Sequence, residues 1–224
     1  MQETPKNSGD KQQLINAIFI PGIILIFMMI SFLFEKGMGL DFHEGGVFPR
    51  RIENIWGIFT MIFVHADWSH LLNNVLSFFI LCSFTYYFYK QIASKVLIIS
   101  YVCSGLILWF IGRDNWHIGA SGLIYSLAFF LFFSGLFRRH IPLIAISLIV
   151  AFIYGSMVWH IFPWQIHDPV SWEGHLAGGT TGSILSIILR NKPPQKPVVV
   201  WNDDENIDLE DYTSETDENV LPEN

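Results

Sequence analysis

Six apolar blocks, most of them about as long as a bilayer is thick, limit what this chain can fold into. They cover residues 14–34, 68–89, 96–111, 121–137, 141–161 and 175–189. A helix needs about 20 residues to cross the hydrocarbon core, and the third and sixth blocks lie near the lower limit. No block shows the polar–apolar alternation of a barrel strand, so helices are the form that satisfies the backbone in lipid. We therefore expect an all-α polytopic membrane protein, a bundle of six transmembrane helices.

The composition favours a membrane protein over a large soluble core. Of the 224 residues, 51% are hydrophobic and only 15% are charged, whereas a soluble domain carries about 25% charged residues. The net charge of −7 comes mostly from the C-terminal tail, and no basic cluster points to nucleic acid. Cys82 and Cys103 lie inside apolar blocks, so we interpret them as small buried hydrophobes, and the sequence has no zinc-ligand spacing.

Lysine and arginine positions predict the orientation in the membrane. With six spans, both termini share one side of the bilayer. That side receives nine basic residues: Lys6, Lys11, Lys90, Lys95, Arg138, Arg139, Arg190, Lys192 and Lys196. The other side receives four: Lys36, Arg50, Arg51 and Arg113. The excess favours cytoplasmic termini, as in a multi-pass protein of a bacterial inner membrane, and Ser121 and His175 then both enter from the outer face.

The chain divides into three parts. Residues 1–13 form a cytoplasmic N-terminal segment, 14–190 the six-helix domain, and 191–224 an acidic cytoplasmic tail that we expect to be disordered. The first block is too long for a removed signal peptide and lacks a small-residue cleavage site, so we interpret it as a permanent span. Within the domain, residues 35–66 form a long outer loop. Its apolar stretch is too short to span, and we expect it to lie in the outer leaflet.

Polar residues within spans are costly, and the first such group is His65, His70 and Asn74. Asp67 or Ser69 can cap the helix that follows, which places His70 and Asn74 on one face near its outer end. Two interfacial histidines and a packing asparagine would account for these residues. A metal site is less favoured, because histidines five residues apart fit a helix face poorly and no carboxylate or cysteine stands at ligand spacing.

The second group is HIGASGLIY, in which Gly119 and Gly122 flank Ser121. These glycines allow a close approach or an unusual backbone conformation. Leu123 replaces the last glycine of a Gly-x-Ser-x-Gly nucleophile elbow, so that motif is absent. Taken alone, the group is typical of small-residue helix packing. Tyr125 lies on the same helix face as Ser121, while His117 either lines a cavity or lies at the interface, and we assign it no catalytic role.

The third group is SWEGHLAGGTTG, where Gly174, Gly178 and Gly182 are four residues apart. They form a smooth stripe that allows another helix to come very near. His175 stands beside the stripe at its outer end. A lone histidine there is more often an interfacial anchor than a catalyst.

Taken together, the groups indicate acyl-transfer chemistry. The glycine stripe would bring His175 within hydrogen-bonding distance of Ser121, and an imidazole can take the proton of a serine and return it to a leaving group. His70, Asn74 and the Ser121 backbone N–H could donate to the resulting oxyanion. Glu173 should face elsewhere on its helix, which leaves a Ser–His dyad without an orienting acid.

At this point the chain resembles the rhomboid family of intramembrane serine proteases over its six-span region. The matching residues are Gly119, Ala120, Ser121, Gly122, Tyr125, His175, Ala177, Gly178, Gly182, His65, His70 and Asn74. The resemblance implies a rhomboid-like bundle with Ser121 as nucleophile and His175 as general base. It implies that His70 and Asn74 line the oxyanion hole and that Tyr125 packs against the catalytic histidine.

The resemblance also implies supporting roles and partners. Gly178 and Gly182 would let the last helix pack on the serine helix, and His65 would be structural. The substrates would be single-pass transmembrane proteins in the lipid bilayer, cut within or near their spans without a metal, nucleotide or other cofactor. The fifth block would be the mobile lateral gate. The chain departs from the family at Trp56-Gly57, where many members carry Trp-Arg.

Two other functions stay open. A non-catalytic rhomboid-like protein could bind membrane clients, although such a relative would usually lose Ser121 or His175. A small transporter or channel would call for charged residues within the spans, which hold almost none, and no inverted repeat is visible.

Overall fold

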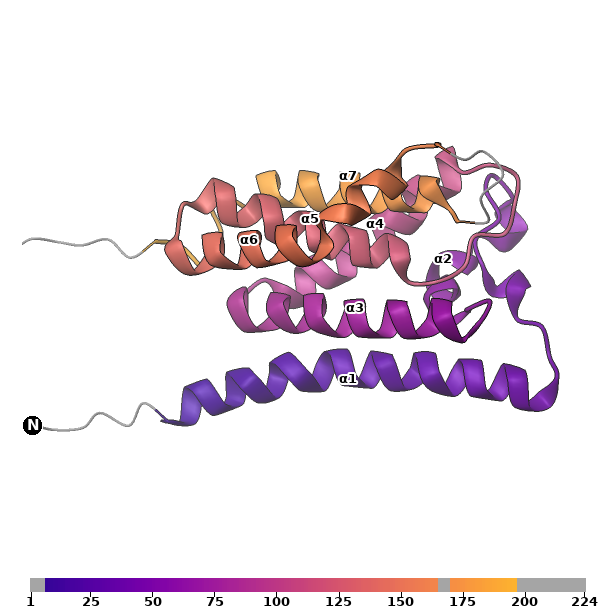
Figure 1. Cartoon of the computed structure of the whole chain (residues 1–224), viewed down its shortest axis with the longest axis horizontal. Coiled ribbons are helices and arrows are strands. Elements are labelled where there is room, and N and C mark those ends of the chain that lie inside the picture. Colours follow the sequence, from indigo (N-terminus) through magenta and orange to yellow (C-terminus); the bar gives the residue numbers. More distant parts are fainter. Residues whose placement is uncertain (1–6, 165–169, 197–224) are drawn as a thin grey trace, which may run out of the picture.

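The computed structural model describes residues 7–164 and 170–196, and within those ranges the fold is helical, without a named strand. Six helices form the bundle (Figure 1): α1 Asn7–Met38, α3 Trp68–Phe88, α4 Ala93–Ile111, α5 Ser121–Arg138, α6 Ile141–Tyr154 and α7 Trp172–Ile188. Five segments are long and apolar enough to span a membrane, while α7 has only 17 residues. The expected class, a rhomboid-like helical bundle, is confirmed, although α7 is shorter than the other five segments.

The six blocks match these helices with shifted ends. The first helix is longer than its block at both ends, because the polar residues before Leu14 and after Phe34 continue the same helix. The last begins at Trp172, three residues before the block, because the Ser171 hydroxyl accepts a hydrogen bond from the Gly174 N–H and caps it. The acidic tail after residue 196 lies outside the described residues.

The fifth block differs most from the prediction. Its α-helix stops at Tyr154 and the chain continues as the 3-10 helix η4, Gly155–Ile161. Two carbonyls of η4, those of Met157 and His160, accept hydrogen bonds from side chains of α5 and α7. Apolar periodicity carries no information about such carbonyl partners, so the change of helix type could not be predicted.

The loop between α1 and α3 is folded, as its apolar residues predict. It contains four short elements: η1 His43–Gly45, η2 Ile52–Asn54, α2 Gly57–Thr60 and η3 Met61–Phe63. Gly57 lies against the backbone of Gly46, where a Cβ would come within 2.1 Å of the Gly46 carbonyl oxygen. A side chain such as the family arginine cannot occupy position 57 in this loop conformation.

Helix α5 is the centre of the bundle: it is the most buried of the five membrane-length segments, and it contacts α3, α4, α6 and α7. Helix α1 packs on α3 at the edge of the bundle (Figure 1). The most extensive contact is between α5 and α7. A Cβ at Gly178 would come within 2.0 Å of the Gly122 carbonyl oxygen, and one at Gly182 within 2.1 Å of that of Ser126. The glycine stripe therefore lets the two backbones touch.

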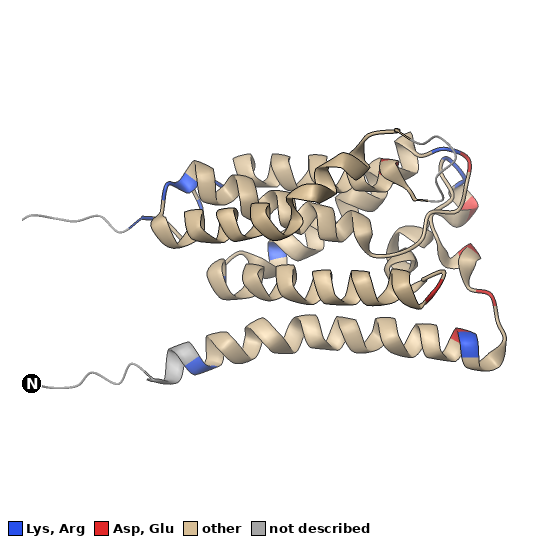
Figure 2. Cartoon of the chain, viewed as in Figure 1, with Lys and Arg blue, Asp and Glu red and all other residues tan. Residues whose placement is uncertain are grey.

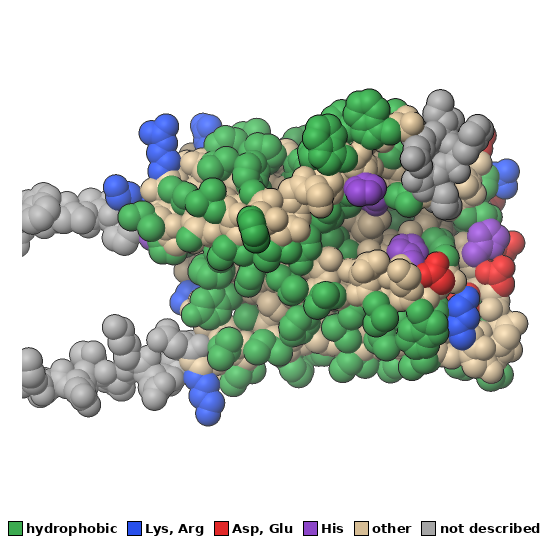
Figure 3. Space-filling model, in the orientation of Figure 1, with side chains coloured by type: hydrophobic (Ala, Val, Ile, Leu, Met, Phe, Trp, Pro, Cys, Tyr) green, Lys and Arg blue, Asp and Glu red, His purple; other side chains and the backbone are tan. Residues whose placement is uncertain are grey.

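The surface has the charge distribution of a membrane protein. Hydrophobic side chains cover most of the bundle's length on the face shown in Figure 3, and charged side chains gather near its two ends. In Figure 2 the end where α1 starts carries Lys and Arg, while the opposite end carries both signs. This band of apolar surface fits an integral multi-pass membrane protein.

Candidate active site

Three helices begin at the end of the bundle that carries both signs of charge, and each supplies a residue to one cavity. Ser121 is the first residue of α5, His70 lies in the first turn of α3, and His175 lies in the first turn of α7. The cavity holds about 440 Å³ and is also lined by Asn74 and His117. Residues from three regions of the sequence therefore face one polar space.

The backbone before Ser121 is shaped by Gly119. Its φ of +96° is a conformation that residues with a side chain rarely adopt, and a Cβ there would lie 2.5 Å from Nε2 of His70. The Gly119 N–H donates to the Met61 carbonyl at 2.8 Å, which ties this turn to the outer loop. Gly122 allows a close approach instead, since its Cβ would meet the Gly174 carbonyl at 3.2 Å.

His175 is held on two sides. Its ring stacks on Tyr125 with the centroids 4.1 Å apart and the planes 7° from parallel. Its Nδ1 lies 3.0 Å from the His160 carbonyl oxygen. Because a carbonyl only accepts, Nδ1 carries the hydrogen, and Nε2 is the basic nitrogen of the neutral ring. The Tyr125 hydroxyl donates to the Met157 carbonyl at 2.9 Å, so η4 fixes both rings.

The expected close approach of the helices that carry Ser121 and His175 is present. A Cβ at Gly122 would lie 3.2 Å from the Gly174 carbonyl oxygen, and one at Gly178 would lie 2.0 Å from the Gly122 carbonyl oxygen. The ring of His175 is held by Tyr125 and η4.

His70 and Asn74 are on the cavity side of α3. Asp67 caps the start of this helix, because its carboxylate accepts a hydrogen bond from the His70 N–H at 2.9 Å. Asn74 is 6% exposed, and its Nδ2 has no hydrogen-bond partner among the described residues. A buried amide donor without an acceptor is costly. This unpaired donor makes Asn74 a candidate to bind an acceptor at this site.

His65 lies behind this pair and does not line the cavity. It is 1% exposed, and its ring meets that of His70 edge to face at 5.0 Å. Burial, with the neighbouring His70, lowers the pKa of His65 to about 3. His65 is therefore neutral at physiological pH and packs as a core residue.

The sequence analysis named His117 as a residue that could line a cavity, but it missed the polar cluster to which His117 belongs, most of which lines the cavity. The cluster consists of Arg113 and His117 from the α4–α5 connection and Ser171 and Glu173 from the start of α7. Glu173 points away from His175 toward Arg113, as its helix position predicts. The contacts join residues more than 50 positions apart, and no local motif indicates them.

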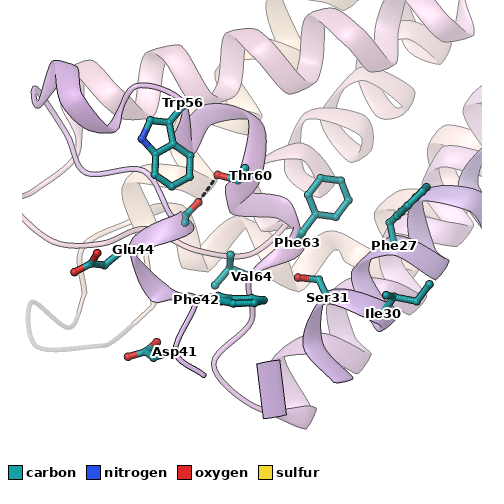
Figure 4. Close-up of a pocket in the computed structure, with 11 residues that line it drawn as sticks. Phe27, Ile30, Ser31, Asp41, Phe42, Glu44, Trp56, Thr60, Phe63 and Val64 are labelled. Atoms are coloured by element: carbon teal, nitrogen blue, oxygen red, sulfur yellow. Dashed lines mark hydrogen bonds between the residues drawn. The ribbon is translucent and has the colours of Figure 1, made fainter. Parts of the chain in front are cut away.

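A larger hollow lies elsewhere. It holds about 610 Å³ between α1 and the outer loop, and Figure 4 shows its lining, which includes Phe27, Phe42 and Phe63. Its polar side chains include Ser31, Thr60, Asp41 and Glu44, and no histidine is among the described residues that line it. The smaller polar cavity is therefore the better candidate for chemistry.

The comparison with known proteins agrees with this geometry. The Rhomboid domain family matches residues 53–192, which contain the whole cavity. The chain belongs to the rhomboid family. It is 32% identical to the uncharacterized proteins Mb1372 of Mycobacterium bovis and Rv1337 of Mycobacterium tuberculosis, over 74% of this chain and 73% of each of theirs. It is 30% identical to the uncharacterized protein ML1171 of Mycobacterium leprae, over 74% of this chain and 70% of that one.

Proposed function

We propose that this rhomboid protein is an intramembrane serine endopeptidase that cleaves single-pass membrane proteins within or near their spans. The observation that carries the proposal is the meeting of Ser121, His175, His70 and Asn74 in one polar cavity. The stacking of His175 on Tyr125 and the bond from its Nδ1 to a carbonyl support the assignment of His175 as the base.

In the proposed reaction, Ser121 Oγ attacks the carbonyl carbon of a substrate peptide bond while its proton passes to Nε2 of His175. A C–O bond forms and the carbonyl oxygen becomes an oxyanion. Asn74 Nδ2, the His70 ring and the Ser121 backbone N–H are the donors that would stabilise it. When the C–N bond breaks, His175 returns the proton to the amine, and water then hydrolyses the acyl-enzyme by the reverse roles.

The imidazolium formed in this cycle needs an acceptor for its Nδ1 hydrogen. The His160 carbonyl oxygen fills that place, 3.0 Å from Nδ1. A carbonyl dipole stabilises the cation less than a carboxylate would, yet it fixes the tautomer in the same way. The proposed centre is therefore a Ser–His dyad oriented by the backbone of η4.

Labelling with a fluorescent fluorophosphonate tests this proposal. We expect Ser121→Ala and His175→Ala to lose labelling and to lose cleavage of a reporter with a Gly-containing span. Ser69→Ala is the matched control, since Ser69 also lines the cavity and is given no role in the reaction. We expect it to label like the wild-type protein.

A folded wild-type protein that shows neither Ser121-dependent labelling nor cleavage would reject the protease. The alternative, a non-catalytic rhomboid-like protein that binds membrane clients, would then be favoured. It predicts that the reporter span co-purifies with the wild-type protein and with Ser121→Ala to the same extent.

We also propose cytoplasmic termini and a location in a bacterial inner membrane, which place the cavity at the outer face. The support is the basic end of the bundle in Figure 2 and the positive-inside rule. Labelling of a cysteine introduced at the exposed Asp114 by a membrane-impermeant maleimide in intact cells tests this orientation, with a cysteine at the exposed Lys90 as the control. Only the first should react.

A further inference from the structure

The polar cluster beside the cavity lies between the two chain segments that lead into the site. His117 precedes Ser121 by four residues, and Ser171 precedes His175 by four. Building on the proposed endopeptidase, we infer that Arg113, His117, Ser171 and Glu173, here called the clamp, position His175 against Ser121 by fastening the first turn of α7 to the α4–α5 connection.

The first link of the clamp runs from His117 to Ser171. His117 is 3% exposed, with Nε2 3.1 Å from the Arg113 carbonyl and Nδ1 2.6 Å from Ser171 Oγ. The carbonyl requires a hydrogen on Nε2, so Nδ1 accepts from the Ser171 hydroxyl. Ser171 Oγ in turn accepts from the Gly174 N–H at 3.1 Å. One hydroxyl therefore both caps α7 and anchors it to the connection.

The second link is an ion pair between Arg113 and Glu173. Glu173 is 1% exposed, and its Oε1 lies 3.6 Å from Arg113 Nε and 3.4 Å from the Arg113 backbone nitrogen. Arg113 Nη2 also donates to the Val170 carbonyl at 3.1 Å, just before α7 begins. A buried carboxylate is costly unless it is paired, so this side chain strongly favours one placement of α7.

The connection itself is braced from the other side. His117 and Val47 of the outer loop exchange two backbone hydrogen bonds, each 2.9 Å long. The clamp therefore does not tie α7 to a loose turn. It ties α7 to a segment that the outer loop already holds.

This anchoring matters because the proposed proton transfer depends on the separation of Ser121 and His175. Tyr125 and η4 orient the histidine ring, whereas the clamp determines where the first turn of α7 stands relative to Ser121. A displacement of about 1 Å between reacting groups can cost about 100-fold in rate. Arg113, His117 and Ser171 also line the cavity, but the four clamp side chains need not touch the substrate to have this effect.

Substitutions of Ser171 test the clamp. Ser171→Thr retains the hydroxyl, while Ser171→Gly removes it but keeps a residue that caps helices nearly as well. The fluorophosphonate rate constant is separated into a maximal inactivation rate and an apparent affinity, with labelling normalised to folded protein. We expect Ser171→Gly to lower the maximal rate by about 10-fold or more at unchanged affinity, and Ser171→Thr to stay within about 3-fold of the wild-type rate.

Hydrogen exchange of the amides of residues 172–176 gives a readout that needs no catalysis. We expect faster exchange there in Ser171→Gly and wild-type exchange in Ser171→Thr. Glu173→Gln, which retains an oxygen facing Arg113, is the second variant if Ser171→Gly does not fold, and it should show the same two effects more weakly.

A Ser171→Gly protein that labels at the wild-type maximal rate would overturn the inference, whatever its exchange. A wild-type protein without Ser121-dependent labelling would instead reject the proposed function. In that case the exchange experiment still decides whether the clamp holds the start of α7. Unchanged exchange of residues 172–176 in Ser171→Gly would reject that role, and faster exchange would support it.

Discussion

Helices α6 and α7 both pack on α5, but in different ways. In α7, ten of 17 residues are buried, and glycines let its backbone touch that of α5. In α6, only four of 14 are buried, in the single stripe Leu143, Ile146, Ser147 and Val150. The two helices also differ in composition. Large apolar side chains such as Leu148, Phe152 and Ile153 are exposed on α6, which suits contact with lipid, whereas the buried residues of α7 are mostly glycines and polar residues.

The difference in packing between α6 and α7 suits separate roles in the proposed reaction. Helix α7, which carries His175, is held at both ends. The clamp holds its start, and near its end the Arg138 guanidinium of α5 donates to the Leu189 and Pro194 carbonyls at 2.6 and 2.8 Å. The helix beside it faces lipid, as a lateral gate for transmembrane substrates would. Both helices pack on α5, and η4, which continues α6, contacts α7.

The largest effect should come from a side chain placed between α5 and α7. Gly182→Val puts a Cβ about where the Ser126 carbonyl lies, 2.1 Å away, and we expect it to cost at least about 3 kcal/mol of unfolding free energy and most of the folded yield. Gly155→Ala at the end of α6 is the control, since a Cβ there meets nothing within 4 Å. Thermal unfolding in detergent measures both. Similar losses in the two variants would contradict the comparison.

A smaller effect is expected from truncating apolar side chains. Leu185→Ala in α7 leaves a cavity, because Leu185 is 4% exposed, and should cost about 2 kcal/mol. Phe152→Ala in α6 removes a side chain that is 92% exposed and should change the unfolding free energy by less than about 0.5 kcal/mol. Unfolding in mixed detergent micelles compares them. A larger cost at Phe152 would mean that α6 packs against protein not present in this chain.

The smallest effect is expected at Tyr125 of α5, which contacts both His175 of α7 and Met157 of η4. Tyr125→Phe keeps the ring that stacks on His175 but loses the hydroxyl bonded to the Met157 carbonyl. We expect a two- to threefold slower fluorophosphonate labelling, because the lost bond is worth about 1 kcal/mol at most. Tyr125→Ala removes the stacking as well and should be slower by about 10-fold or more. Equal rates for the two variants would show that the ring contributes nothing to the position of His175.

The sequence predicted the fold and much of the cavity, because both depend on patterns local to one helix. Block length predicted the spans, and the spacing of Gly174, Gly178 and Gly182 predicted a helix that approaches its neighbour closely. Helical spacing also put His70 and Asn74 on one face. These patterns arise from the geometry of a single helix, so they can be read without knowledge of the packing.

The remaining features of the site depend on contacts that leave no local pattern. The acceptor for His175 is a backbone carbonyl, and every residue carries one, so position 160 has no signature in the sequence. The His117–Ser171 contact joins residues 54 positions apart in two connections. Gly57 became interpretable only when the Gly46 backbone was found against it.

The first half of α6 is attached tightly to α5, whereas the second half is more exposed. Ser147 Oγ is bonded to the Phe132 carbonyl at 2.8 Å, and at Gly135 a Cβ would come within 2.2 Å of the Leu143 carbonyl. From Ser147 to Tyr154 the helix rises about 10 Å, so a tilt of about 10° around this point would move its far end by about 2 Å. That end continues into the two carbonyls that hold Tyr125 and His175, and such a swing would therefore be transmitted directly to the proposed base.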